Sequence, residues 1–157
     1  MKKVTFSGGF HKVAPISLRV SDKAFNALED VKNGLEKNGH VVYLPNCYDD
    51  PVTNDDNKLM DDQEYLDFFR SIYYESRDKI SEVDAILVLN YTKGKNGVAL
   101  SNYVGASTFL EMYEAFMNGK KIFMMNDYPD NMLYDEIKGF GPVIINGKKF
   151  LEDKLDL

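Results

Sequence analysis

The sequence predicts an α/β protein in which helices cover both faces of one parallel sheet of about five strands. Short apolar runs alternate with amphipathic segments in the order β-α-β-α-β-α-β-α-β. This alternation is typical of parallel sheets, because a helix usually carries the chain back between parallel strands. No repeat or linker interrupts it, and 157 residues that are 44% hydrophobic suffice for one core. We therefore expect a single domain over residues 1–157.

Composition excludes several classes of function. The formal net charge of −6, with scattered lysines, argues against a binding face for a nucleic-acid polymer. One cysteine, Cys47, excludes an internal disulfide framework and a cysteine-rich zinc site, and fits a reducing, cytoplasmic environment. The chain shows neither the apolar core of a signal peptide nor a run near the roughly 18 apolar residues of a membrane span.

The first predicted strand, residues 3–6, runs into the small residues Ser7, Gly8 and Gly9. The carboxyl end of a strand is where α/β sheets bind ligands, so these three residues are candidates for substrate binding. A glycine pair also serves ordinary turns, and no dinucleotide fingerprint or phosphate-binding lysine motif accompanies this one.

The next elements are a helix, a strand and a second helix. The first helix is expected from Ser21 or Asp22 to about Lys37, where Asn38-Gly39 stops it. His40 then begins a strand that reaches residue 44, and we expect it at the surface rather than on a metal. The second helix, residues 62–80, carries an aromatic stripe interpreted mainly as core, with a surplus for a subunit contact: Tyr65, Phe68, Phe69, Ile72 and Tyr73.

Between these helices lies an Asn- and Asp-rich loop, residues 46–62. Its length fits either a solvated loop or a lid over the site. The spacing of its acidic residues does not match a calcium-binding helix–loop–helix motif.

The second half of the chain begins with its most apolar strand, residues 85–89, followed by a loop over 90–103. A helix then starts near Gly105, with Ser107 or Thr108 as its cap, and ends at Gly119. Its apolar face is predicted to be Phe109, Met112, Tyr113 and Phe116. A strand over 122–125, a short helix over 133–138 and a last strand over 143–145 complete the pattern.

Right-handed crossovers bring the loops after the first, third and fourth strands to one edge of the sheet. That edge would gather residues 7–9, Asn90 and Tyr91, residues 105–111, and Asn126 with Asp127. The sequence therefore predicts a pocket there.

Glu111 is the carboxylate of that pocket. A lone carboxylate nucleophile suits attack on an anomeric carbon, which leaves a covalent glycosyl ester. The alternative is an ordinary surface residue near a helix start, where glutamate complements the helix dipole. Asp84 precedes its strand, so simple topology puts it at the opposite edge, in a capping or bracing role.

Four stretches of the chain resemble the nucleoside 2-deoxyribosyltransferase family: residues 4–9, 35–41, 83–90 and 105–123. The resemblance implies a flavodoxin-like (Rossmann-like) fold in which Glu111 attacks C1′ of a 2′-deoxynucleoside and Asp84 assists at the base. It further implies a sugar-site loop at Ser7–Gly9 and no metal or organic cofactor. The partners would be a nucleoside or nucleotide and further copies of the chain, in a homo-oligomer.

This chain departs from the family pattern at Gly105. The transferases have an acidic residue there, and relatives that hydrolyse deoxynucleoside 5′-monophosphates have a phosphate-binding serine. Ser107 and Thr108 are close by, and Lys12 and Arg19 are candidate cations for a phosphate. Transfer to a second base, hydrolysis and nucleotide binding without chemistry therefore remain as alternatives, the last using the helix start at 105–107 as an anion site.

Overall fold

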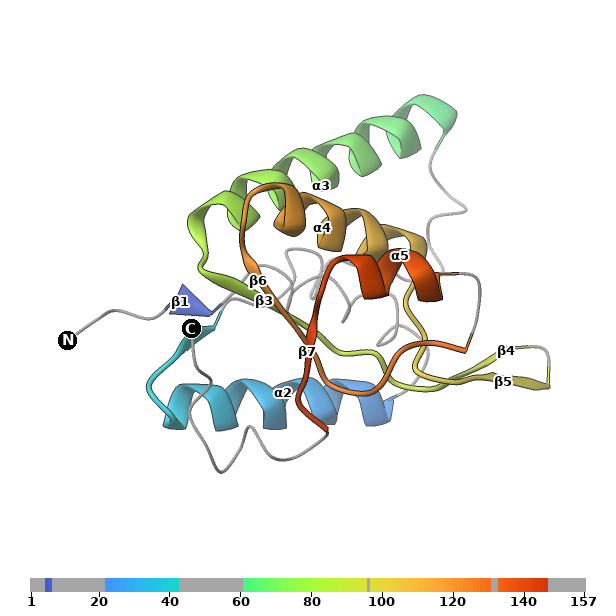
Figure 1. The fold of residues 1–157 in the computed structure, drawn as a ribbon. Coiled ribbons are helices and arrows are strands. Elements are labelled where there is room, and N and C mark those ends of the chain that lie inside the picture. The colour runs from blue at the N-terminus through green and yellow to red at the C-terminus, as the bar shows by residue number, and fades with distance from the viewer. Residues whose placement is uncertain (1–4, 7–21, 43–60, 96, 131–132, 147–157) are drawn as a thin grey trace.

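The computed structural model describes residues 5–6, 22–42, 61–95, 97–130 and 133–146 (Figure 1). The main sheet has the strand order β2-β1-β3-β6-β7, and every neighbouring pair is parallel. The predicted parallel sheet is therefore confirmed. Its strands are β1 (Thr5–Phe6), β2 (Val41–Val42), β3 (Ala85–Val88), β6 (Lys121–Met124) and β7 (Val143–Ile144).

The helices are α2 (Asp22–Lys37), α3 (Asp62–Glu82), α4 (Ala106–Met117) and α5 (Tyr134–Gly139). In Figure 1, α2 lies on one side of the sheet, whereas α3 and α4 lie on the other. The strand order explains this arrangement. The chain steps from β1 to β2 in one direction along the sheet and from β2 to β3 and onward in the other. Right-handed crossovers in opposite directions place their helices on opposite faces.

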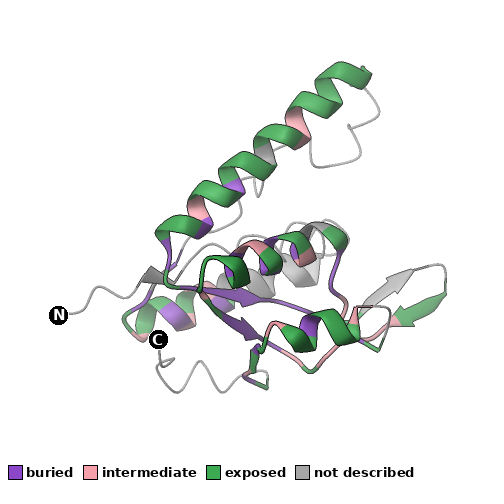
Figure 2. Ribbon diagram, turned by 45° about the horizontal axis from the view of Figure 1, so that its top comes forward, coloured by how far each residue is buried: buried purple, intermediate pink, exposed green. Residues whose placement is uncertain are grey.

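The core lies between these layers, and β3 is its centre because all four of its residues are buried. The helices contribute apolar side chains to both faces of the sheet, and Figure 2 shows the buried positions concentrated there. They are Val31 and Leu35 of α2, Ile80 of α3, Met112 and Ala115 of α4, and Ile137 of α5. His40, expected at the surface, is only 4% exposed, because it leads directly from the tight turn at Gly39 into β2.

Helix α3 is longer than predicted, and its aromatic stripe is not mainly core. The helix begins with a capping box between Asp61 and Glu64. Along its first two-thirds no described side chain is buried, and Ser76 is the first that is. The interpretation of the stripe as core was therefore wrong for most of its residues, because α3 extends past the sheet that would cover them (Figure 1).

The predicted loop over 90–103 contains a β-hairpin. Strands β4 (Lys93–Lys95) and β5 (Val98–Leu100) pair antiparallel, apart from the main sheet. Gly97 has a φ of +76°, which favours glycine. The sequence pair Asn96-Gly97 is a strong hairpin signal that the prediction of a plain loop overlooked.

Helix α4 differs from its prediction in its cap and in its buried face. Its N-cap is Gly105, rather than Ser107 or Thr108. Gly119 closes it at a φ of +66°, as expected. The aromatic residues of the predicted apolar face gather around the ring of Phe140, just after α5: Phe109 and Phe116 lie at 5.5 Å and Tyr113 at 6.5 Å between ring centroids. Tyr113 and Phe116 are exposed, whereas Phe109 also packs against the core.

Candidate active site

The candidate site lies at the carboxyl ends of β1 and β3. From β1 the chain goes to β2 on one side, whereas β3 is its neighbour on the other, so the strand order reverses between them. Such a switch point opens a crevice in which α/β proteins bind ligands. Ser7, Gly8 and Gly9 follow β1 in the chain and lie outside the described residues, as do Lys12, Arg19 and residues 46–60 of the predicted lid loop.

Asn90 and Asn126 form an asparagine clasp at this edge. Asn90 is fully buried, and its side-chain Nδ2 donates to the main-chain carbonyls of Asn126 at 3.2 Å and Asp127 at 2.8 Å. Its Oδ1 accepts from the N–H of Asn126 at 2.9 Å, and the Nδ2 of Asn126 donates to the carbonyl of Asn90 at 3.1 Å. The clasp ties the loop after β3 to the loop after β6.

The segment that leads from the hairpin into α4 is held by further hydrogen bonds. The N–H of Tyr103 donates to the carbonyl of Tyr91 at 3.2 Å, and the N–H of Asn102 donates to Oγ1 of Thr92 at 3.3 Å. Asn102 has a φ of +52°, which asparagine tolerates better than most residues. These bonds close the hairpin onto the sheet edge, so α4 starts beside the clasp.

Glu111 lies on the face of α4 that packs against β3 and β6. It is 7% exposed, and the other buried residues of this face are Thr108, Met112 and Ala115, at helical spacing. Glu111 follows the first residue of α4 by five positions, or about 7 Å along the axis. It is therefore not the surface residue that the sequence left as an alternative. A carboxylate that is shielded from bulk water, on the helix that leaves the carboxyl edge of the sheet, is a candidate to act on a ligand bound at that edge.

Asp84 lies at the other end of β3. Its side chain is exposed, and its main-chain carbonyl accepts from the N–H of Lys121 at 3.3 Å. Lys121 begins β6, where the chain arrives after α4 has ended. Asp84 therefore lies at the end of the sheet where α4 has ended, whereas Glu111 lies in the middle of α4.

The remaining predicted site residues lie at the start of α4. Gly105 is buried and caps the helix without a side-chain hydrogen bond, and Thr108 is buried one turn later. Ser107 belongs to the first turn of the helix, but its side chain lies outside the described ones. Asn126, which the sequence placed at the same edge, lies just beyond its apolar strand, as Asn90 does.

Tyr91 adds an electrostatic feature beside the clasp. Burial raises the pKa of its phenol, and the carboxylate of Asp30 on α2 raises it further. Both effects disfavour the phenolate, so Tyr91 is a neutral hydrogen-bonding group at pH 7.

Among the described residues, no three side chains of His, Cys, Asp or Glu converge to hold a metal ion. None of the helices described is long and apolar enough to cross a membrane.

Comparison with known proteins was informative at the level of structure. No protein-family model matches the sequence, and no curated protein does. The fold resembles the 2-deoxyribosyltransferase of Bacillus psychrosaccharolyticus, at a TM-score of 0.59 and 12% identity over 98% of this chain and 92% of that one. It also resembles the CMP N-glycosidase of Clostridium botulinum, at 0.49 and 19% over 96% of each chain. The first likeness confirms the family resemblance at the level of fold: over nearly its whole length, the chain has the fold of a 2-deoxyribosyltransferase.

Proposed function

We propose that the protein cleaves the N-glycosidic bond of 2′-deoxynucleosides or their 5′-monophosphates, with Glu111 as the nucleophile. One observation carries the proposal: Glu111 is only 7% exposed, on the helix that leads away from the carboxyl edge of the sheet. The fold, shared with a 2-deoxyribosyltransferase, supports the same assignment. We place the chemistry in one flavodoxin-like domain of about five parallel strands.

The reaction has two displacements. A carboxylate oxygen of Glu111 bonds to C1′ while the bond from C1′ to the base nitrogen breaks, and the electron pair leaves with the base, which takes up a proton. A nitrogen of a second base, or a water, then attacks C1′ and releases the carboxylate, losing its own proton. Two inversions give net retention at C1′. With a base the product is a new nucleoside, and with water it is free 2-deoxyribose; a 5′-monophosphate substrate gives the same products with the phosphate retained.

Burial of Glu111 supports this role physically. A carboxylate in bulk water must shed hydrogen-bonded solvent before it can attack carbon, whereas a buried one has already exchanged that shell for protein groups. The transition state resembles an oxocarbenium ion, so a fixed negative charge beside C1′ also stabilises it electrostatically.

The proposal rests on Glu111 rather than on a pair of carboxylates, because Asp84 lies at the far end of β3. The main-chain carbonyl of Asp84 accepts a hydrogen bond from the N–H of Lys121 and so joins β3 to β6. We propose further that the enzyme works in the cytoplasm as a homo-oligomer, with neither metal nor organic cofactor.

A second candidate function is nucleotide binding without turnover. The observation that favours it is the N-cap of α4. Because Gly105 has no side chain, it leaves the first N–H groups of the helix without the bond that a serine or aspartate cap would accept. Such N–H groups bind phosphate well.

One assay separates the two functions. The protein is incubated with each deoxynucleoside and each deoxynucleoside 5′-monophosphate, with and without an acceptor base, and released base is measured by chromatography. We expect base release that Glu111→Gln abolishes. Binding of nucleotide by calorimetry, with no base released from any of these substrates, would favour the binding module and overturn the proposal.

A further inference from the structure

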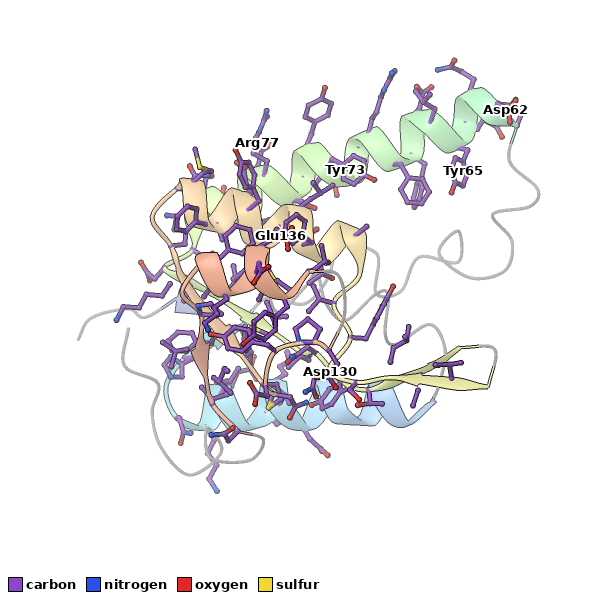
Figure 3. The ribbon with its side chains drawn as sticks, turned by 45° about the vertical axis from the view of Figure 1, so that its right-hand side comes forward. Asp62, Tyr65, Tyr73, Arg77, Asp130 and Glu136 are labelled. Carbon is purple, nitrogen blue, oxygen red and sulfur yellow. The ribbon has the colours of Figure 1, made fainter. Side chains whose placement is uncertain are left out.

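Helix α4 buries two polar side chains, Thr108 and Glu111. Thr108 is 1% exposed and Glu111 is 7% exposed, and no other polar side chain among those described on α4 is buried. The other buried positions of the helix, Met112 and Ala115, are apolar and belong to the core. Figure 3 shows side chains filling the space between α4 and the strands. A polar group enclosed in this way is stable only when it is hydrogen-bonded.

The two polar residues are three positions apart, which is about one turn of the helix. Residues at this spacing are neighbours on a helix, with about 5–6 Å between their Cβ atoms. A helical side chain also leans toward the N-terminus, over the residues three and four positions earlier. The long side chain of Glu111 therefore reaches back toward Thr108.

The two side chains are chemically complementary. A threonine hydroxyl has one O–H to donate, whereas an ionised carboxylate only accepts. A hydrogen bond to a charged acceptor is about twice as strong as one between neutral groups. The hydroxyl would therefore stabilise the ionised form of Glu111, which is the form that can attack carbon.

We propose that Thr108 is a positioning residue for Glu111. Its hydroxyl donates to one carboxylate oxygen, keeps its own proton throughout the reaction, and leaves the other oxygen to attack C1′. A glutamate side chain loses considerable rotamer freedom when it is fixed. A carboxylate that is already held in the attacking orientation does not incur this loss in the transition state. The catalytic part of this inference rests on the proposed function, whereas the pairing of the two side chains does not.

Substitution of Thr108 separates the effect of its hydroxyl from that of its methyl group. Thr108→Val keeps the shape and removes the hydroxyl, so kcat for base release should fall about tenfold or more while KM changes less than about threefold. Thr108→Ser keeps the hydroxyl and removes a buried methyl group. It should retain at least about half of kcat, although urea unfolding should show a fold less stable than the wild type. A purely structural role would not restore kcat in a destabilised serine variant.

A double-mutant cycle tests the pairing without any turnover. Thr108→Val, Glu111→Leu and the double variant are unfolded in urea at pH 7. Their effects on the unfolding equilibrium constant should depart from independence by at least about threefold, because either change removes the same hydrogen bond. Val31→Ala is the matched control. Val31 is buried on α2, across the sheet from α4 (Figure 1), so its effect should be independent of Glu111→Leu within about twofold.

The outcomes separate this inference from the proposed function. If the wild type releases no base from any substrate, the proposed function fails, and the cycle alone decides whether the two side chains pair. If the wild type is active and the cycle shows no coupling, the hydroxyl donates elsewhere, as to the main-chain carbonyl of Val104 four residues earlier. That result overturns the inference and leaves Glu111 as the nucleophile.

The kinetic results can also overturn the inference. It fails if kcat is unchanged in Thr108→Val, or if Thr108→Ser loses as much of kcat as Thr108→Val does. Circular dichroism establishes that each variant is folded. If Thr108→Val is unfolded, Thr108→Ala replaces it in both experiments, because alanine also lacks the hydroxyl and favours the helix.

Discussion

A polar residue flanks β3 at each end, and one of the two is buried whereas the other is exposed. Asn90, after the carboxyl end, is fully buried, and its side chain donates two hydrogen bonds and accepts one within the asparagine clasp. Asp84, before the amino end, has an exposed side chain, and its main-chain carbonyl joins it to β6. Only four residues of strand separate the two ends.

The direction of the strand, rather than the type of residue, accounts for this difference. At the carboxyl end of β3 the chain leads into the loop that starts α4, so Glu111 and the clasp lie toward that side. At the amino end the neighbouring segment is the turn where α4 has already ended. A carboxylate at a parallel strand therefore lies near a ligand crevice only on the carboxyl side.

The largest expected effect is that of Glu111→Gln, which keeps the size of the side chain and removes its charge. Because amide oxygen is a poor nucleophile, kcat/KM for base release should fall at least about a thousandfold, equivalent to about 4 kcal/mol. The free energy of unfolding should change by about 1 kcal/mol or less. Steady-state kinetics and urea unfolding measure the two quantities. Undiminished activity in the pure, folded variant would remove Glu111 from the mechanism.

The second effect is on stability, through Asn90→Ala. This change leaves the N–H of Asn126 and the carbonyls of Asn126 and Asp127 without their partner, so the free energy of unfolding should fall by about 2–4 kcal/mol. Asn126→Ala removes only the single bond to the carbonyl of Asn90 and should cost about 0.5–1.5 kcal/mol. Urea unfolding of both variants measures the two losses in the free energy of unfolding. Equal costs would mean that Asn90 does not hold the clasp as its hydrogen bonds indicate.

The sequence predicted the carboxyl edge well because apolar runs and helix stops identify strands and their direction. The helix α2 was expected over the same residues that form it, and the meeting of Asn90 with Asn126 followed from the alternation alone. Local patterns of this kind depend on neighbours in the sequence, so one sequence suffices to detect them.

What the sequence did not predict depends on contacts between distant elements. Phe109, Tyr113 and Phe116 were predicted as part of the apolar face of α4, but their ring partner is Phe140, which belongs to a later part of the chain. The buried positions of α4 are Thr108, Glu111, Met112 and Ala115. The burial of Glu111 therefore could not be read from the periodicity of its own helix.

A smaller effect is expected on the pKa of the phenol of Tyr91, the residue after Asn90. Its pKa is raised above the ordinary value of 10, so the folded state holds this proton more tightly than the unfolded state. The resulting stabilisation is present below pH 10 and is lost as the pH rises through the folded pKa. Asp30→Asn removes one cause of the shift, so the phenolate of Tyr91 should form at a lower pH. Ultraviolet difference titration against Tyr91→Phe measures this, and an unchanged pKa would exclude the influence of Asp30.

The smallest effect is expected for Asp84→Asn, the same carboxylate-to-amide change as at Glu111 but at the other end of β3. Because Asp84 is exposed and precedes the amino end of β3, the free energy of unfolding should shift by about 0.5 kcal/mol or less, and kcat/KM by about twofold or less. Parallel assays with Glu111→Gln give the comparison. A loss as large as that of Glu111→Gln would bring Asp84 back into the chemistry.

Trapping the covalent intermediate tests the central claim most directly. The protein is mixed with a 2′-deoxynucleoside without acceptor base, quenched with acid at a series of times, digested and analysed by mass spectrometry. We predict that one deoxyribosyl group is attached to the peptide that contains Glu111, appears together with released base, and is lost when an acceptor base is added before the quench. Release of base at every time with no adduct on that peptide, or with an adduct on another residue, would contradict the assignment of Glu111 as the nucleophile.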